Sequence, residues 1–168
     1  TSMAGASCRA IWECIERDAF VISYLNKLPR AKIQIGDPSI KTICSLFKRY
    51  NLEVHCFDIT SDIKIPVILT LLIDRTGIGP ALTVGIKCSL DVKSAIIGSI
   101  EEANQFRPFI RKELLTKKII VRKDDLYKFE HKLRILYWNN RARLRYLDFL
   151  LDTKEQVKMS KIKSYKGD

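Results

Sequence analysis

The hydrophobic period of the sequence changes twice along the chain, and this change constrains the fold more than any other feature. Up to residue 50, apolar residues recur at helical spacing. Residues 52–60, 65–75 and 81–89 have the length and composition of strands, and the turn-rich stretches SDIK and TGIGP separate them. Helical spacing then returns. We therefore expect an α+β fold in which helices pack on a mainly antiparallel β-sheet.

Cap residues set the bounds of the expected helices. Asp37 precedes a proline and Asp91 precedes a new apolar period, as is typical of N-caps. We expect helices over residues 8–27, 38–50, 92–108 (resuming over 111–115), 125–138 and 142–152. The Lys-rich segment 152–168 is expected to be a flexible tail, which leaves a single domain over residues 1–151.

Composition excludes several classes of protein. No apolar run approaches the roughly 20 residues of a membrane span, and no basic and hydrophobic leader precedes the fold. The five cysteines are scattered and include no CxxC pair, which is typical of a reducing compartment. We therefore expect a cytoplasmic protein without a membrane span or a disulfide framework.

The formal net charge is +11, and residues 111–168 alone carry +9 of it. Such a basic block fits either a solvated helical surface or an anionic partner. A nucleic-acid site would use the arginines and aromatic residues that alternate here, namely Arg141, Arg143, Arg145, Tyr137, Trp138 and Tyr146. However, Leu144, Leu147 and Leu150 run through the same stretch, which favours a helix packed on the core. Nucleic acid is therefore not an expected partner.

The first helix carries two carboxylates one turn apart. Its apolar stripe, expected to face the core, comprises Ile11, Trp12, Ile15, Ile22 and Leu25. Glu13 and Glu16 lie on the opposite face, which also carries two aromatic residues. Neighbouring carboxylates on a largely buried helix repel each other unless a positive charge lies nearby. This positive charge has two candidate sources. One is a local ion pair with Arg9 or Arg17, which the pattern alone favours, and the other is a divalent metal ion.

The helix over 92–108 has a similar polar face. Glu102 and Gln105 lie together there, and Gly98 precedes Glu102 by one turn. Glycine costs about 1 kcal/mol in a helix interior, so its presence indicates close approach by a ligand or another backbone. Arg107 returns to the apolar stripe, where its guanidinium must either reach the surface or meet a bound anion.

If the two helices face each other, their oxygen donors form a site for Mg²⁺, which favours carboxylates and substrate phosphates. The site would consist of Glu13, Glu16, Glu102 and Gln105. No Walker motif or GxGxxG is present, and neither His55 nor His131 has an evident catalytic partner. Metal-assisted phosphate chemistry is thus the one enzymatic interpretation that several residues support.

Four collinear segments resemble the YcaO-domain family. Residues 1–33 contain AIWECIERDA followed by NKLPR, similar to the family's AxxExxERDA and NxLPR. The segment LEVHCFDITSDIKIPV is similar to LEV…DxTxDxxIPV, and ALTVGIKCSLDVKSAIIGSIEEANQFR to the family's AxxxAxxExxQxR. LDFLL matches a late family motif, so the resemblance spans about residues 1–151.

The resemblance implies an ATP-dependent enzyme that phosphorylates a peptide amide oxygen, so that a nucleophile can attack the carbonyl carbon. The product is an azoline, a thioamide or an amidine. Glu13 and Glu16 match the family's metal-binding ExxE, and Glu102 matches a further metal ligand. Gln105 matches a position beside the nucleotide, and Arg107 matches the arginine of QxR, which we also assign to the ATP site. The implied cofactors are ATP and Mg²⁺.

The chain departs from the family pattern at several places. Arg9 stands where serine is common, and Gly98 where serine or asparagine is common. Residue 1 falls inside the family domain, and the absence of a Pro-rich C-terminus leans toward a thioamide-type or divergent relative. The resemblance further implies a peptide or protein substrate and, as partners, an E1-like or TfuA-like protein or a second copy of the chain. One alternative is a non-catalytic YcaO-like module that binds a partner protein or precursor peptide, and a second is a basic nucleic-acid-binding protein.

Overall fold

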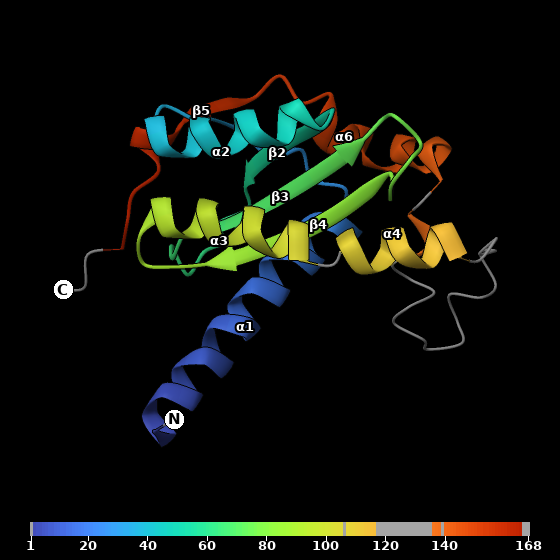
Figure 1. The fold of residues 1–168 in the computed structure, drawn as a ribbon. Coiled ribbons are helices and arrows are strands. Elements are labelled where there is room, and N and C mark those ends of the chain that lie inside the picture. The colour runs from blue at the N-terminus through green and yellow to red at the C-terminus, as the bar shows by residue number, and fades with distance from the viewer. Residues whose placement is uncertain (1, 106, 117–135, 139, 166–168) are drawn as a thin grey trace.

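A computed structural model describes residues 2–105, 107–116, 136–138 and 140–165. Figure 1 shows the arrangement of the helices and strands. In chain order they are α1 (Met3–Leu25), β1 (Lys32–Gln34), α2 (Pro38–Arg49), β2 (Leu52–Asp58), β3 (Val67–Asp74), β4 (Leu82–Cys88), α3 (Val92–Gln105), α4 (Arg107–Thr116), a 3₁₀-helix (Arg141–Leu147), α6 (Asp148–Leu151), β5 (Gln156–Lys158) and a 3₁₀-turn (Met159–Lys161).

The strands form one sheet in the order β4-β3-β2-β1-β5. Every pair is antiparallel except β1 and β5, which are parallel. Leu69 of β3 lies opposite Phe57 of β2 and Ile86 of β4, which fixes the register at the centre of the sheet. All of β3 is buried, because its two faces are both covered. The expected α+β class with a mainly antiparallel sheet is confirmed.

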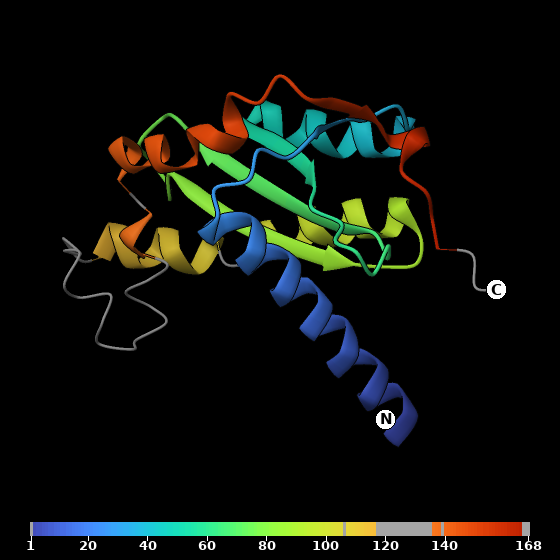
Figure 2. The same ribbon diagram turned by 180° about the vertical axis from the view of Figure 1, so that it is seen from behind.

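Helices cover both faces of this sheet (Figures 1 and 2). On one face α1 and the segment 141–151 pack against side chains such as Leu69 and Leu71. On the other face α2 and α3 pack against residues that include Ile68. Because successive residues of a strand point to opposite faces, β3 contributes to both cores.

Gly85 lets α3 lie unusually close to β4. A β-carbon at this position would lie 2.0 Å from the carbonyl oxygen of Ser99 and 2.4 Å from the backbone nitrogen of Ala103. This approach brings the hydroxyl of Ser99 within 2.7 Å of the hydroxyl of Thr70 on β3, and both side chains are buried. The contact therefore fixes α3 against β3 and β4.

The expected helices over 8–27, 38–50 and 92–108 correspond to α1, α2 and α3, but α3 ends at Gln105, and Arg107 belongs with residues 111–115 to α4. Asp37 caps α2 by accepting from the backbone nitrogen of Ser39, and Asp91 accepts from that of Ser94 at the start of α3. Instead of one helix, residues 142–152 form a 3₁₀-helix followed by α6. The expected helix over 125–138 lies largely outside the described residues.

The segment that the sequence predicts to be a flexible tail adds a strand to the sheet, which corrects the expectation for residues 152–165. β5 pairs with β1, and Ile33 lies opposite Val157. Further along, the backbone nitrogen of Tyr165 donates to the carbonyl of Leu90 at 2.9 Å. β1 and β5 have only three residues each, so neither has a detectable hydrophobic period. Their pairing joins distant parts of the chain.

The buried face of α1 also differs from the expected one. Ile15, Glu16, Ala19 and Ser23 are buried, whereas Ile11 is 58 % exposed and Leu25 is 70 % exposed. The first turns of α1 project away from the sheet (Figure 2). From Trp12 onward the helix packs against the protein, through a face that also includes Phe20 and Tyr24.

The basic C-terminal segment packs on the sheet, as the leucine pattern favoured. Leu144, Leu147 and Leu150 are buried in the core that α1 shares. The guanidinium of Arg143 lies over the ring of Tyr137, 3.6 Å from its centroid. This arginine and this tyrosine therefore contact each other.

Candidate functional site

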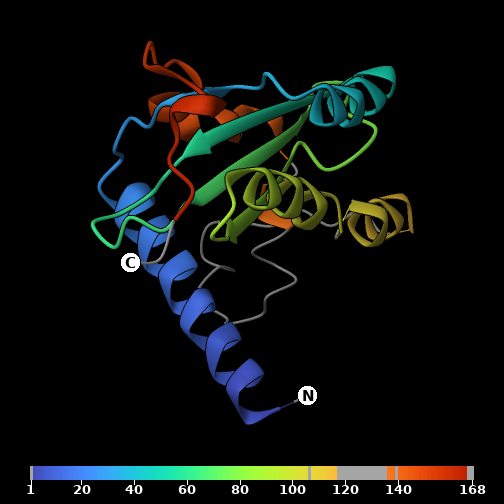
Figure 3. The same cartoon turned by 90° about the vertical axis from the view of Figure 1, so that its left-hand side faces the viewer.

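Glu16 and Glu102 both lie at the outer edge of the sheet. β4 is an edge strand, so alternate backbone N–H groups of β4 point away from β3. The N–H of Cys88 donates to Oε1 of Glu16 at 2.7 Å, and the N–H of Ile86 donates to Oε2 of Glu102 at 3.0 Å. Because α1 and α3 lie on opposite faces of the sheet (Figure 3), the two carboxylates approach the edge of β4 from opposite sides.

Glu13 lies near this pair but has a different environment. Its side chain is 54 % exposed and accepts a hydrogen bond from Arg17 Nε at 2.7 Å, one turn along α1. The local ion pair that the pattern favoured is therefore present for Glu13. Glu16 instead is 7 % exposed and turns toward β4. Below, "the carboxylate cluster" denotes Glu13, Glu16 and Glu102.

The cluster is electrostatically coupled. Burial raises the pKa of Glu102, and the negative charges of Glu16 and Glu13 raise it further. The hydrogen bond from Ile86 and the charge of Lys87 act in the opposite direction but do not cancel the rise. A carboxyl group whose ionised form is disfavoured by neighbouring carboxylates gains from any cation that enters between them.

Lys87 supplies a positive charge at this place, and the sequence did not single it out. Its ammonium lies 3.3 Å from Oε1 of Glu16. Its side chain passes over Gly98, where a β-carbon would lie 2.8 Å from Cγ of Lys87. The sequence signal for a close neighbour was Gly98 in the interior of α3. That neighbour is the side chain of Lys87.

Gln105 lies beside Glu102, as the sequence predicts. The two side chains line an open groove of about 630 Å³ together with Lys87, Gly98, Glu101 and Asn104. The groove borders the edge of β4, so a ligand in it would contact Glu102 directly.

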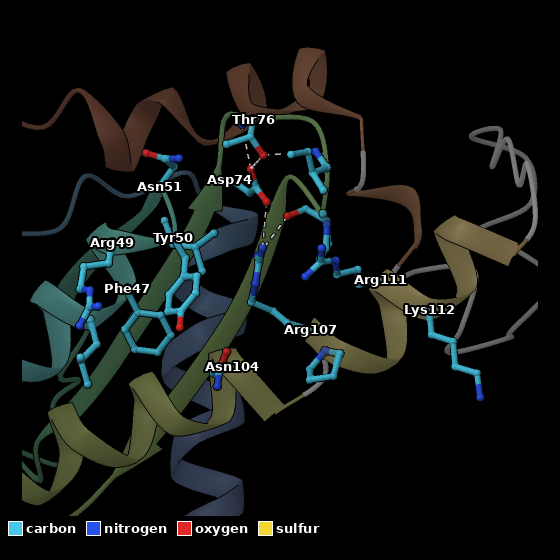
Figure 4. A pocket seen from close by; sticks show the side chains of 16 residues that line it. Phe47, Arg49, Tyr50, Asn51, Asp74, Thr76, Asn104, Arg107, Arg111 and Lys112 are labelled. Atoms are coloured by element: carbon cyan, nitrogen blue, oxygen red, sulfur yellow. Dashed lines mark hydrogen bonds and ion pairs between the residues drawn. The ribbon is translucent and has the colours of Figure 1, made fainter.

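Arg107 lies elsewhere. Its guanidinium is buried and donates to Oδ2 of Asp74 at 3.0 Å and to the carbonyl of Pro80 at 3.1 Å (Figure 4). Arg107 thus does not extend to the surface but pairs with a carboxylate of the protein itself, beside a cavity. Its partner Asp74 ends β3 and was not predicted, because 33 residues separate the two in the sequence.

The ion pair forms one wall of a cavity of about 880 Å³ between the end of α2, the turn after β3 and the start of α4. Phe47 comes from α2, Tyr50 directly follows that helix, and Arg111 and Lys112 come from α4 (Figure 4). Burial tends to raise the pKa of Asp74, but hydrogen bonds from Thr76 and the charge of Arg107 outweigh it and hold that pKa below its usual value.

The donors at the edge of β4 suit a hard divalent cation. Glu16 comes from α1 and Glu102 from α3. Carboxylates are the ligand type that Mg²⁺ takes in proteins. In the described part of the chain, however, no three Asp, Glu, His or Cys side chains converge closely enough to hold a metal ion. The donor chemistry fits Mg²⁺, whereas the three carboxylates lie too far apart in this structure to hold the ion together, and the ammonium of Lys87 lies beside Glu16.

Comparison with known proteins agrees with these observations. The family model described as YcaO cyclodehydratase, ATP- and Mg²⁺-binding, matches residues 1–164. The match extends over nearly the whole chain and therefore shows the family. The chain belongs to the YcaO family. No curated protein sequence matches the chain.

Solved structures share the fold at low sequence identity. The heterocyclase TruD is 16 % identical with a TM-score of 0.70, and the match covers 99 % of this chain and 21 % of TruD. A chain of the E. coli microcin synthetase McbBCD complex is 15 % identical with a TM-score of 0.71, covering 99 % and 44 %. YcaO from Methanopyrus kandleri bound with AMPPCP and Mg²⁺ is 12 % identical with a TM-score of 0.65, covering 96 % and 39 %. The chain thus spans less than half the length of each.

Among the described residues, no helix combines the length and the apolar character that crossing a membrane requires.

The five cysteines are free, and Cys56 and Cys88 are buried. Burial raises the pKa of the Cys56 thiol to about 12, so this thiol stays protonated.

Proposed function

We propose that the chain forms part of an enzyme that uses ATP and Mg²⁺ to activate a backbone amide of a peptide or protein. Membership of the YcaO family supports this function. The observation that carries it is that Glu16 and Glu102 accept hydrogen bonds from the same edge of β4. These are residues that the family resemblance assigns to the metal.

The reaction follows from the chemistry of phosphoryl transfer. Transfer of the terminal phosphoryl group of ATP to the amide oxygen makes that oxygen a leaving group. A nucleophile then adds to the carbonyl carbon and phosphate departs. A Cys, Ser or Thr side chain gives an azoline, sulfide gives a thioamide and an amine gives an amidine. Such catalysis needs positioning and neutralisation of phosphate charge more than a protein nucleophile.

Each predicted site residue has a place in this proposal. The carboxylate cluster would hold Mg²⁺, and Gln105 would lie beside the nucleotide because it lines the same groove as Glu102. Arg107 donates to Asp74 and Pro80 and also lines the cavity described above, and its guanidinium has further N–H donors. We therefore keep the assignment of Arg107 to the ATP site as a proposal, in addition to its role in holding α4 against the turn that follows β3.

A peptide or protein is the proposed substrate. The solved relatives are longer chains, and one of them belongs to a complex of several subunits. We propose that this chain also acts with a partner subunit, of the E1-like or TfuA-like kind, or with a second copy of itself. A cytoplasmic location stays a prediction from the sequence.

One observation favours a second candidate function. The ammonium of Lys87 already offsets negative charge in the carboxylate cluster. A chain in which this lysine permanently replaces the metal would be a non-catalytic YcaO-like module that binds a partner protein or precursor peptide.

Calorimetric titration of ATP into the full chain, with and without Mg²⁺, tests the first proposal. We expect Mg²⁺-dependent binding that weakens by about tenfold or more in Glu102→Gln, since a charge-assisted contact of this kind is worth about 1.5–3 kcal/mol. Glutamine keeps an oxygen that can accept from Ile86, so the fold should persist. Glu155→Gln, the same change at an exposed site before β5, is the control.

Equal affinity for Mg·ATP in Glu102→Gln and Glu155→Gln would remove Glu102 from the metal site. Absence of binding in the unmodified chain would instead favour the non-catalytic module.

A further inference from the structure

Lys87 occupies an unusual position at the edge of β4. Its two neighbours in the strand, Ile86 and Cys88, donate their N–H groups to Glu102 and Glu16 respectively. The stem of Lys87 lies against Gly98 on the face that α3 covers, while its ammonium reaches Glu16 on α1. One lysine side chain therefore connects the two helices that carry the carboxylate cluster.

Gly98 is required for this placement. A β-carbon there would lie 2.8 Å from Cγ and 3.0 Å from Cδ of Lys87, so any other residue would displace the stem. Glycine in a helix interior weakens the helix, and α3 has Gly98 at the one point where the lysine crosses it. Lys87 and Gly98 thus form a matched pair that sets the position of the ammonium.

We propose that Lys87 is a built-in counter-ion of the carboxylate cluster, which holds Glu16 and Glu102 together without metal and must be displaced before Mg²⁺ can bind. This inference rests on the proposed function in taking Glu16 and Glu102 as metal ligands. The reason is electrostatic: the ammonium and Mg²⁺ are both cations, they repel each other, and both are attracted to Glu16.

The charge of Lys87 therefore lowers the affinity of the cluster for metal. It also stabilises the metal-free arrangement, because it offsets part of the repulsion among the three carboxylates. The side chain of Lys87 is 42 % exposed, which allows the ammonium to swing into solvent while its stem stays over Gly98.

The test measures Mg²⁺ binding to the full chain by calorimetry, with Mg²⁺ as the only ligand, because free nucleotide would itself bind the added metal. Lys87→Met removes the charge and keeps an unbranched stem over Gly98. Lys93→Met is the matched control, because Lys93 is a similarly exposed lysine on α3 that pairs with Asp37 instead. We expect Lys87→Met to bind Mg²⁺ roughly tenfold more tightly than the unmodified chain, and Lys93→Met to bind unchanged.

A second measurement is thermal unfolding without metal. Lys87→Met should unfold at a lower temperature than the unmodified chain, and added Mg²⁺ should raise its midpoint more than that of the unmodified chain. Lys87→Arg, which keeps the charge, should not gain affinity for Mg²⁺.

The outcomes separate the two proposals. If the unmodified chain binds Mg²⁺ and Lys87→Met binds it equally or more weakly, the counter-ion role is wrong and the proposed function stands. If only Lys87→Met binds Mg²⁺, the counter-ion role holds and the unmodified chain is the non-catalytic module. If neither chain binds Mg²⁺, the metal site of the proposed function is wrong and this inference fails with it.

Discussion

Substitution of Gly85 tests the packing that brings Glu102 to the edge of β4. In Gly85→Ala the new β-carbon would lie 2.0 Å from the carbonyl oxygen of Ser99 and 2.4 Å from the backbone nitrogen of Ala103. Ordinary contacts of this kind require about 3.4 Å or more. Because both opposing atoms belong to the backbone of α3, no side-chain rotation relieves the clash, and the helix must shift outward by about 1 Å or more.

The shift has two measurable consequences. Overpacking of a tight interface costs about 1–3 kcal/mol, and separation of the buried hydroxyls of Thr70 and Ser99 adds about 1 kcal/mol. We therefore expect Gly85→Ala to lower the free energy of unfolding by about 3 kcal/mol. It should also weaken Mg·ATP binding, because Glu102 moves with α3 away from Ile86.

The assay is urea unfolding followed by circular dichroism, with Gly36→Ala as the control. Nothing lies within 4 Å of a β-carbon at Gly36, so that variant should retain the stability of the unmodified chain to within about 1 kcal/mol. Equal stability of the Gly85→Ala and Gly36→Ala variants would refute the close packing of α3 on β4.

Two further predictions concern the ion pair between Asp74 and Arg107. Arg107→Met should lower the free energy of unfolding by about 3 kcal/mol in urea titrations, because it leaves a buried carboxylate with only Thr76 as a partner; a loss below about 1 kcal/mol would contradict a buried pair. The folded-state pKa of Asp74 is lowered, so its stabilisation is complete above the ordinary aspartate value of about 3.9 and is lost as the pH falls through the lower folded value. The unmodified chain should therefore lose stability relative to Asp74→Asn as the pH decreases below about 4, and parallel pH profiles for the two chains would argue against this linkage.

Much of the fold follows from local patterns. The strands β2, β3 and β4 and the helices α1, α2 and α3 were predictable, because each has its own hydrophobic period and a cap or turn at its ends. β1 and β5 were not predictable, because three residues carry no period and their pairing depends on distant segments. The face of α1 was predicted only in part: Trp12 and Ile15 pack on the core, whereas Ile11 and Leu25 are exposed because only part of the helix is covered.

The candidate site divides in the same way. Spacing placed Glu102 and Gln105 on one face of a helix, as the structure has them, but it did not show that Glu16 is buried at β4 while Glu13 stays exposed. Gly98 and Arg107 were recognised as anomalies, but their partners Lys87 and Asp74 lie on other elements. A helical wheel describes one helix and does not say what lies opposite it.

The class of fold, the family and the residue types at the site follow from periodicity, caps and collinear motifs, which are local properties of the chain. The pairing of charges does not, because it depends on contacts between distant segments. The N–H groups of Cys88 and Ile86 on β4 donate to Glu16 and Glu102, and Gly98 admits the stem of Lys87, whose ammonium lies beside Glu16. Electrostatic interactions depend on distance in space, which the packing of α1 and α3 on opposite faces of the sheet establishes.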